Sequence, residues 1–109
     1  MELKEASDAF SALSRESRLM VLKRLIIAGP QGEAAGDIAA GLNVSAPNMS
    51  FHLKELERAG LIQSRREGRS VIYAADYGGV RALIDFLLAD CCAGDRRLCG
   101  PYVIKESAS

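Results

Sequence analysis

The sequence predicts a mainly α-helical fold with one β-hairpin, in the arrangement of a winged helix-turn-helix. Three observations lead to this fold class. Apolar residues recur at helical spacing in successive segments, a tight turn precedes the best-defined helix, and two short β-prone segments follow that helix around a Glu-Gly pair. Two short helices joined by such a turn can set the second helix into the major groove of DNA. The order of elements is therefore typical of a DNA-binding domain.

The first three helices are predicted from their apolar periodicity. The first covers residues 3–13, the second runs from about residue 15 to residue 28, and the third covers roughly residues 37–42. Gly29-Pro30 is expected to end the second helix. The side chains expected to face the core are Leu3, Ala6, Phe10 and Leu13 in the first helix, Leu19, Leu22 and Ile26 in the second, and Ile38 and Leu42 in the third.

The fourth helix, residues 45–59, has the best-specified boundaries. Ser45 follows a tight turn and is a good N-cap, and Pro47 falls in the first turn, where its missing N–H costs nothing. Gly60 is placed to end the helix. Its buried stripe is predicted to consist of Met49, Leu53 and Leu56.

A hairpin and a last helix complete the expected domain. Residues 61–66 and 69–73 read as two strands around Glu67-Gly68, because Gly68 can supply the backbone angles that a tight hairpin needs. Asp76 is placed to cap a helix that ends at Gly94. The apolar stripe of this helix is Val80, Leu83, Ile84, Leu87, Leu88 and Cys91. We therefore expect a DNA-binding and dimerisation domain over residues 1–92 and a C-terminal tail over residues 93–109.

Composition indicates a small globular protein. The N-terminus has neither the basic nor the apolar region of a signal peptide, and the longest apolar stretches are too short to cross a bilayer. Three cysteines, an odd number, then argue for reduced thiols. We expect a cytoplasmic protein without a membrane partner.

The net charge of zero hides a local excess of positive charge. Residues 45–70 hold five cations, namely Lys54, Arg58, Arg65, Arg66 and Arg69, against three glutamates. Such a small surplus of positive charge usually belongs to a solvated surface without a binding role. The alternative interpretation of the fold is a three-helix bundle whose hairpin has no function. Three of the five cations, however, lie on or beside the predicted hairpin, where a wing would meet phosphate groups.

Three segments of the chain resemble the ArsR/SmtB family of metal-sensing repressors: residues 13–27 (LSRESRLMVLKRLII), 45–61 (SAPNMSFHLKELERAGL) and 65–73 (RREGRSVIY). The resemblance extends from Leu3 to about Cys92. The run from Ser50 to Leu61 and the Gly68-Arg69 wing are together quite specific. The resemblance implies a homodimer that blocks a promoter and releases the DNA when its ligand binds.

The DNA-facing residues are predicted from the helical wheel of residues 45–59. Asn48 and Ser50 can contact base edges, whereas Lys54 and Arg58 can hold phosphates. The full DNA-binding set expected on double-stranded operator DNA is Ser45, Pro47, Asn48, Ser50, Phe51, His52, Lys54, Arg58, Arg65, Arg66 and Arg69.

Two residues of this set need separate interpretations. Phe51 stands where members of the family often carry arginine, and an aromatic ring there favours contact with thymine methyl groups. The alternative is that Phe51 folds down onto the wing. His52 flanks the buried stripe, and as the chain's single histidine it is interpreted as a hydrogen-bonding boundary residue rather than as a metal ligand.

The cysteines define the candidate effector site. The family's arsenic site has cysteines in a segment that aligns with residues 33–37, and its zinc site needs histidine on the last helix; this chain has neither. Its cysteines, Cys91, Cys92 and Cys99, are instead gathered within nine positions. A tail that turns back after Gly94 can join them in a three-thiolate cup, which suits trivalent arsenic or antimony above all. The expected effector is trivalent arsenic, as arsenite or methylarsenite, and antimonite is the related antimony species. A Cys-Cys-x6-Cys tail also resembles a subgroup of the family that senses arsenite at the end of the last helix.

Several alternative roles of the cysteines stay open. Zinc usually takes four ligands and would need a further one, whereas cadmium and lead suit soft thiolates nearly as well. A thiol redox switch would need Cys99, because a bond between the neighbours Cys91 and Cys92 would be strained. Cys91 could also be a small buried hydrophobe, and the protein could be a repressor that no ligand releases.

The first and last helices are expected to form the homodimer interface, because their apolar stripes have no obvious partner within the chain. A two-fold dimer would set two recognition helices about 34 Å apart, one turn of DNA. An enzyme is not favoured, because the chain has no nucleotide-binding loop, no second histidine and no acid–base pair near the cysteines. No catalytic residue and no organic cofactor are expected.

Overall fold

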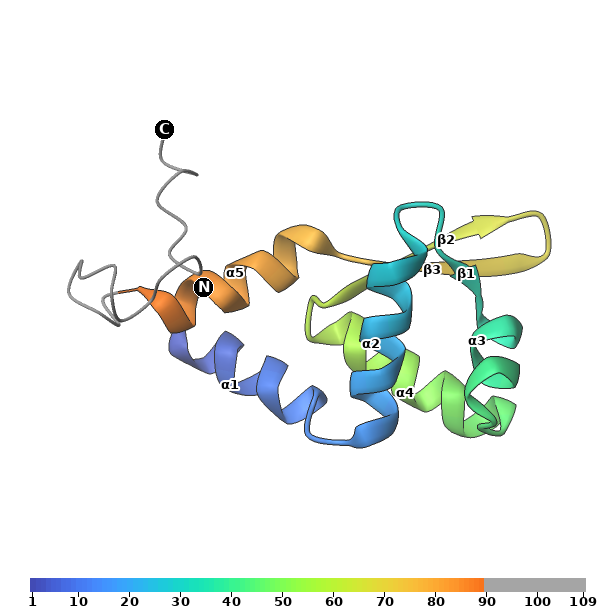
Figure 1. Cartoon of the computed structure of the whole chain (residues 1–109), viewed down its shortest axis with the longest axis horizontal. Helices are drawn as coiled ribbons and strands as arrows, with labels where there is room; N and C mark the ends of the chain where they lie inside the picture. The colour runs from blue at the N-terminus through green and yellow to red at the C-terminus, as the bar shows by residue number, and fades with distance from the viewer. Residues whose placement is uncertain (90–109) are drawn as a thin grey trace.

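The computed structural model describes residues 1–89 and confirms the predicted winged helix-turn-helix (Figure 1). The helices in this part of the chain are α1 (Leu3–Ala12), α2 (Glu16–Ala28), α3 (Ala35–Leu42), α4 (Ala46–Arg58) and α5 (Tyr77–Leu88). The strands are β1 (Glu33–Ala34), β2 (Ile62–Glu67) and β3 (Ser70–Ala75), which form an antiparallel sheet in the order β1-β3-β2. None of the helices described is long and apolar enough to span a membrane.

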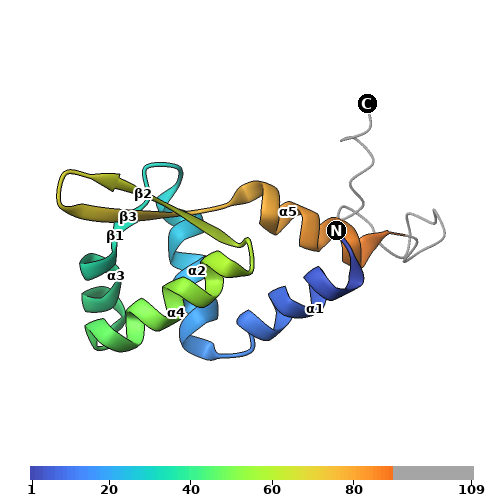
Figure 2. The same ribbon diagram turned by 180° about the vertical axis from the view of Figure 1, so that it is seen from behind.

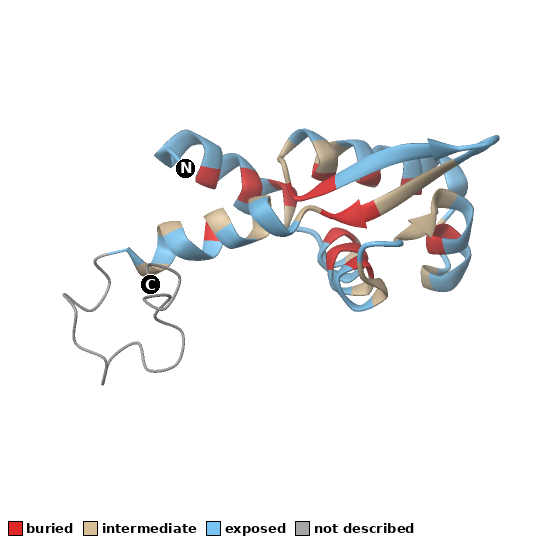
Figure 3. Cartoon of the chain, turned by 90° about the horizontal axis from the view of Figure 1, so that it is seen from above, coloured by how far each residue is buried: buried red, intermediate tan, exposed pale blue. Residues whose placement is uncertain are grey.

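The sheet and the pair α1 and α5 lie at opposite ends of the domain, as both views show (Figures 1 and 2). Between them α2 packs against α3, α4 and β3. The buried positions form one continuous core (Figure 3). Its largest fully buried side chains are Val21, Leu25, Ile38, Met49, Leu53, Leu56, Leu61 and Ile62. The predicted inner stripe of the fourth helix, Met49, Leu53 and Leu56, is therefore confirmed.

The buried face of α2 differs from the prediction. Leu22 is buried as expected, but Leu19 and Ile26 are 47% and 39% exposed. The residues that face inward are Arg18, Val21, Leu22 and Leu25. The apolar residues of α2 are distributed around most of its circumference, so their periodicity alone does not identify the inner face. The contacts of α2 with α4 and β3 determine which face is buried.

The buried face of α1 consists of its alanines. Ala6, Ala9 and Ala12 are at most 6% exposed, whereas Leu3 is 74% exposed and Phe10 43% exposed. Small side chains allow α1 to approach α4 and α5 closely, and the larger apolar residues remain on the surface of this protomer.

The strands β2 and β3 form the predicted hairpin with a shifted turn. Glu67 pairs with Ser70, so the turn consists of Gly68 and Arg69 rather than of Glu67 and Gly68. Gly68 has a φ of 63°. A positive φ at the first of two turn residues is typical of a type II′ turn, whose twist matches that of the flanking strands.

A third strand, β1, was missed by the sequence analysis. Its residues Glu33 and Ala34 pair with Tyr73 and Ile72 of β3. Glu33 also accepts two hydrogen bonds from Arg24 of α2, from Nε at 2.6 Å and from Nη2 at 3.0 Å. This bidentate ion pair fastens the strand to α2. A strand of two residues cannot show a period of two, and the sequence therefore holds no signal for it.

The last helix is shorter than predicted. Asp76 caps α5 as expected, because its side chain accepts a hydrogen bond from the N–H of Gly79 at 3.0 Å. The helix ends at Leu88, and Ala89 has an extended backbone with φ −61° and ψ 124°. A continuous helix to Gly94 is therefore wrong. In the last turn of α5, Leu87 is 53% exposed.

Candidate nucleic-acid interface

The helices α3 and α4 are joined by the predicted tight turn. Asn43 adopts the left-handed conformation with φ 56°, which asparagine tolerates better than most residues. The N–H of Val44 donates to the carbonyl of Ala39 at 3.0 Å. Ser45 then caps α4 by accepting a hydrogen bond from the N–H of Asn48 at 3.4 Å. Local contacts thus hold the two helices of a helix-turn-helix in a fixed relation.

The outer face of α4 is exposed along its length. The exposed residues are Ser45, Pro47, Asn48, Ser50, Phe51, Lys54 and Arg58, all of them in the predicted DNA-binding set. Ser50 lies beside the base of the wing, where it lines a cavity of about 90 Å³ together with Tyr73 of β3. The arrangement brings the recognition helix and the hairpin together on one side of the core.

Phe51 packs toward α2 rather than onto the wing. The guanidinium carbon of Arg18 lies 5.3 Å from the centre of the Phe51 ring, a cation–π contact. The phenylalanine nevertheless remains 56% exposed. Its ring is therefore held from behind and available to a ligand in front.

His52 is a hydrogen-bonding boundary residue, in agreement with the sequence interpretation. Its Nδ1 accepts a hydrogen bond of 3.1 Å from Nε of Arg18, which is only 6% exposed. A ring nitrogen that accepts this bond is unprotonated, so the imidazole is neutral. Burial lowers the pKa of His52 first, and the positive charges of Arg18 and Arg15 lower it further.

We predict that the protein loses stability as the pH falls below about 6.5. In this range the histidine of the unfolded chain binds a proton, whereas folded His52 resists one because its pKa is lowered. The unfolded state then binds more protons, and the free energy of unfolding decreases. Urea denaturation at about pH 7.5 and about pH 5.5 measures the effect. His52→Asn, which retains an acceptor for Arg18, should show a weaker pH dependence.

The same prediction has a direct spectroscopic test. His52 is the chain's single histidine, so its ring signal in a proton NMR titration is unambiguous. A measured pKa at or above the ordinary histidine value would contradict the account.

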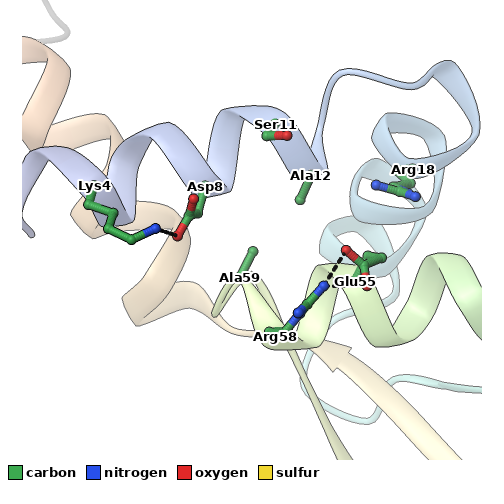
Figure 4. Close-up of a pocket in the computed structure, with 8 residues that line it drawn as sticks. All are labelled: Lys4, Asp8, Ser11, Ala12, Arg18, Glu55, Arg58 and Ala59. Atoms are coloured by element: carbon green, nitrogen blue, oxygen red, sulfur yellow. Dashed lines mark hydrogen bonds and ion pairs between the residues drawn. The ribbon is translucent and has the colours of Figure 1, made fainter.

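The two cations of α4 have different surroundings. Lys54 is exposed and makes no ion pair within residues 1–89. Arg58 donates from Nη2 to both carboxylate oxygens of Glu55, at 2.7 and 2.8 Å, and these hydrogen bonds raise the pKa of its guanidinium. It faces the groove between α4 and α1 (Figure 4). The charge of Arg58 is therefore partly balanced by Glu55, whereas Lys54 has no such partner among residues 1–89.

Arg65 fastens the wing to the body of the domain. Its Nη1 and Nη2 donate to the carbonyls of Pro30 and Gln31 at 3.3 and 2.7 Å, and its Nε donates to Glu67 at 2.7 Å. The guanidinium is thus occupied by bonds within the protomer. In this structure Arg65 positions the wing.

Arg66 lies on the other face of β2, on the same side as Ser64. The hydroxyl of Ser64 donates to Glu57 of α4 at 2.7 Å, so this face of the strand adjoins the recognition helix. Arg66 and the turn residue Arg69 are both exposed, and neither forms an ion pair in the part of the chain described. They are the wing cations that are available for phosphates.

The three cysteines, Cys91, Cys92 and Cys99, lie outside the described residues together with the tail 93–109, and their thiolate site stays a prediction. Among residues 1–89, no three His, Cys, Asp or Glu side chains are grouped so that they could hold a metal ion. The segment 33–37 forms β1 and the first turn of α3.

Known proteins share this fold and sequence pattern. Residues 13–65 match a family model described as a helix-turn-helix domain. The chain is 32% identical to the transcriptional repressor SdpR of Bacillus subtilis (strain 168) over 92 residues, which are 84% of this chain and 99% of that protein. The solved ArsR-like transcriptional regulator from Rhodococcus sp. RHA1 is similar with a TM-score of 0.72 and 31% identity, over 97% of this chain and 94% of that one. The chain belongs to the ArsR-like family of helix-turn-helix transcriptional regulators.

Membership of the ArsR-like family makes this protein a DNA-binding transcriptional regulator, and the prediction that it is not an enzyme is confirmed by its relatives. A further solved structure, described as a possible transcriptional regulator for arsenical resistance, has a TM-score of 0.63 at 29% identity and covers 76% of this chain and 88% of that one.

In this ArsR-like domain Arg18 joins α2 to the recognition helix, a role that was not predicted from the sequence. A weak signal was present. Residue 18 begins the series 18, 21, 22 and 25, whose other members are the buried apolar residues of α2. A single charged residue in an otherwise apolar series marks a buried cation that needs partners, and here these are His52 and Phe51.

Proposed function

We propose that this protein is a homodimeric repressor that binds operator DNA through α4 and the wing and releases it when trivalent arsenic binds Cys91, Cys92 and Cys99. The observation that carries the DNA-binding part is the exposed outer face of α4, whose inner face is buried in the core. A helix held in this way can enter a major groove without giving up any core contact.

The N-terminal half of α4 is proposed to read the bases. Asn48 and Ser50 are exposed in the first turns, the part of a recognition helix that contacts base edges. Phe51 presents an apolar ring that fits a thymine methyl group. Because Arg18 holds this ring from behind, little conformational freedom would be lost on binding.

The cations Lys54, Arg66 and Arg69 are proposed to hold phosphates on both sides of the groove. They are exposed and without ion pairs in the described chain, so contact with DNA would break no interaction. Arg65 and Arg58 would act differently, since Arg65 holds the wing and Arg58 is bonded to Glu55.

Lys54→Ala is expected to weaken operator binding and to lower the slope of log affinity against log salt by about one for each phosphate that the lysine neutralises. Fluorescence anisotropy of labelled operator DNA at several salt concentrations measures both. Lys23→Ala is the matched control, because Lys23 is an exposed lysine of α2 outside the proposed interface. If the wild type and Lys54→Ala had equal slopes of log affinity against log salt, Lys54 would not be a phosphate contact.

A second copy of the chain is proposed to cover the apolar surface of α1 and α5. These two helices lie at the end of the domain opposite the sheet (Figure 1). Their exposed large side chains include Leu3, Phe10, Ile84 and Leu87, at 74%, 43%, 43% and 53%. Burying such a patch against its own copy gives a two-fold dimer. Two α4 helices can then bind successive major grooves.

Trivalent arsenic is proposed as the effector because three thiols lie within nine positions directly after α5. The similar structure described as a possible transcriptional regulator for arsenical resistance supports this choice. Other soft metals, or oxidation of the thiols, are the alternatives. Any of these effectors must bind the DNA-incompetent state more tightly, because equal affinity for both states shifts nothing.

A further inference from the structure

A polar groove lies between α1, α2 and the recognition helix (Figure 4). It has a volume of about 350 Å³ and is lined by residues of three helices, among them Lys4, Asp8 and Ser11 of α1, Arg18 of α2, and Glu55 and Arg58 of α4. This volume is within the range of small-molecule sites. Of the residues predicted from the sequence to contact DNA, only Arg58 is among those that line the groove.

The charges of the groove leave one cation without a counter-ion. Lys4 pairs with Asp8 at 3.3 Å, and Arg58 pairs with Glu55 at 2.7 Å. Arg18 is 6% exposed and makes no ion pair with any described residue.

The partners of Arg18 do not compensate its charge. Its Nε donates to neutral His52, and the ring of Phe51 lies against it. Its two terminal amino groups donate to no acceptor among residues 1–89, and they are not sealed in the core but remain accessible from the groove that Arg18 lines. Buried cations in proteins are normally paired with an anion, so this arrangement calls for one.

We propose that the groove binds a small organic carboxylate whose oxygens pair with the terminal amino groups of Arg18. A guanidinium presents two parallel N–H donors that match the two oxygens of a carboxylate. A single negative charge balances the lining, because the other charged residues already form pairs. Ser11, Lys4 and Asp8 can hold a polar substituent at the other end.

The position of Arg18 links the groove to the recognition helix. The same guanidinium that would receive the carboxylate contacts His52 and Phe51 of α4. Binding should therefore be visible at these two residues as well as at Arg18, in the absence of DNA. Carboxylate binding in this groove can therefore be tested independently of the proposed arsenic response.

NMR titration of the isotope-labelled, full-length protein tests the proposal. The probes are acetate, lactate and benzoate, each compared with its uncharged amide: acetamide, lactamide and benzamide. We expect millimolar carboxylate, and not the amide, to shift the side-chain Nε–H signal of Arg18 and the ring signals of His52. No shift with any of the three carboxylates, or equal shifts with the amides, would overturn the proposal.

A matched pair of variants on α1 locates the site. Ser11→Leu puts a larger side chain into the groove without removing a charge, and the response to carboxylate should be lost. Ser7→Leu changes an exposed serine one turn earlier that does not line the groove, and the response should remain. A wild-type response in Ser11→Leu would contradict binding in this groove. Both serines are exposed, so both variants should fold.

Discussion

Arsenite at micromolar concentration is expected to lower the operator affinity of the reduced protein by about tenfold or more, and Cys99→Ser is expected to abolish this response. Cys91 and Cys92 are neighbours in the sequence, and Cys99 supplies the third thiolate of the proposed site. The substitution leaves α4 and the wing unchanged, so operator affinity without arsenite should equal that of the wild type. Fluorescence anisotropy on DNA from the protein's own promoter region measures both quantities.

Parallel titrations decide between arsenic and its alternatives. Zinc and cadmium test other metals, and a thiol oxidant such as diamide tests a redox switch. Release by cadmium or diamide but not by arsenite would replace arsenic as the effector and leave the DNA-binding account intact. If arsenite released the Cys99→Ser protein from operator DNA at the same midpoint concentration as the wild type, the three-thiolate site would be contradicted.

Gly79→Ala is expected to destabilise the fold by roughly 3 kcal/mol, the upper part of the usual range for overpacking. A Cβ at Gly79 would overlap the carbonyl oxygen of Gly60. Neither side of this contact can move freely, because Gly60 has a φ of 81° and the N–H of Asp76 donates to the carbonyl of Leu61 at 2.9 Å. Thermal or urea unfolding, followed by circular dichroism, measures the loss.

Gly78→Ala is the matched control, since it changes the neighbouring glycine of the same helix. The nearest atom to a Cβ there is Oδ1 of Asp76 at 3.5 Å, an ordinary contact. Alanine is a better helix former than glycine, so this variant should be neutral or more stable by up to about 1 kcal/mol. Equal destabilisation of both variants would show that close packing of α5 against the end of α4 is not the cause.

The parts of the fold that could be predicted are those with local signals. Ser45 and Pro47 mark the start of α4 by their own chemistry, and Gly68 marks the hairpin. Phe51 is the one other large apolar residue of α4 and does not share the spacing of Met49, Leu53 and Leu56, so periodicity identifies the inner face of this helix. These elements are the ones that present the candidate DNA-binding residues.

The parts that could not be predicted depend on partners far along the chain. Arg18 finds its partner His52 34 positions later, and Arg65 finds Pro30 35 positions earlier. The place of Arg18 in the buried series of α2 indicates burial but not its partner, and Arg65 carries no local sign that separates a positioning role from a phosphate contact. The strand β1 exists because β3 offers it a free edge. Tertiary contacts, rather than propensity, decide these features.

The central claim, that the exposed face of α4 reads DNA, is tested most directly by replacing the operator's thymines one at a time with uracil. The exchange removes only a methyl group. The account predicts that wild-type affinity falls by about fourfold at a few positions, the value of one buried methyl group, and that Phe51→Ala no longer distinguishes thymine from uracil there. Ile27→Ala, which shortens an exposed apolar residue of α2, should retain the wild-type pattern. An unchanged uracil pattern in Phe51→Ala would contradict the claim.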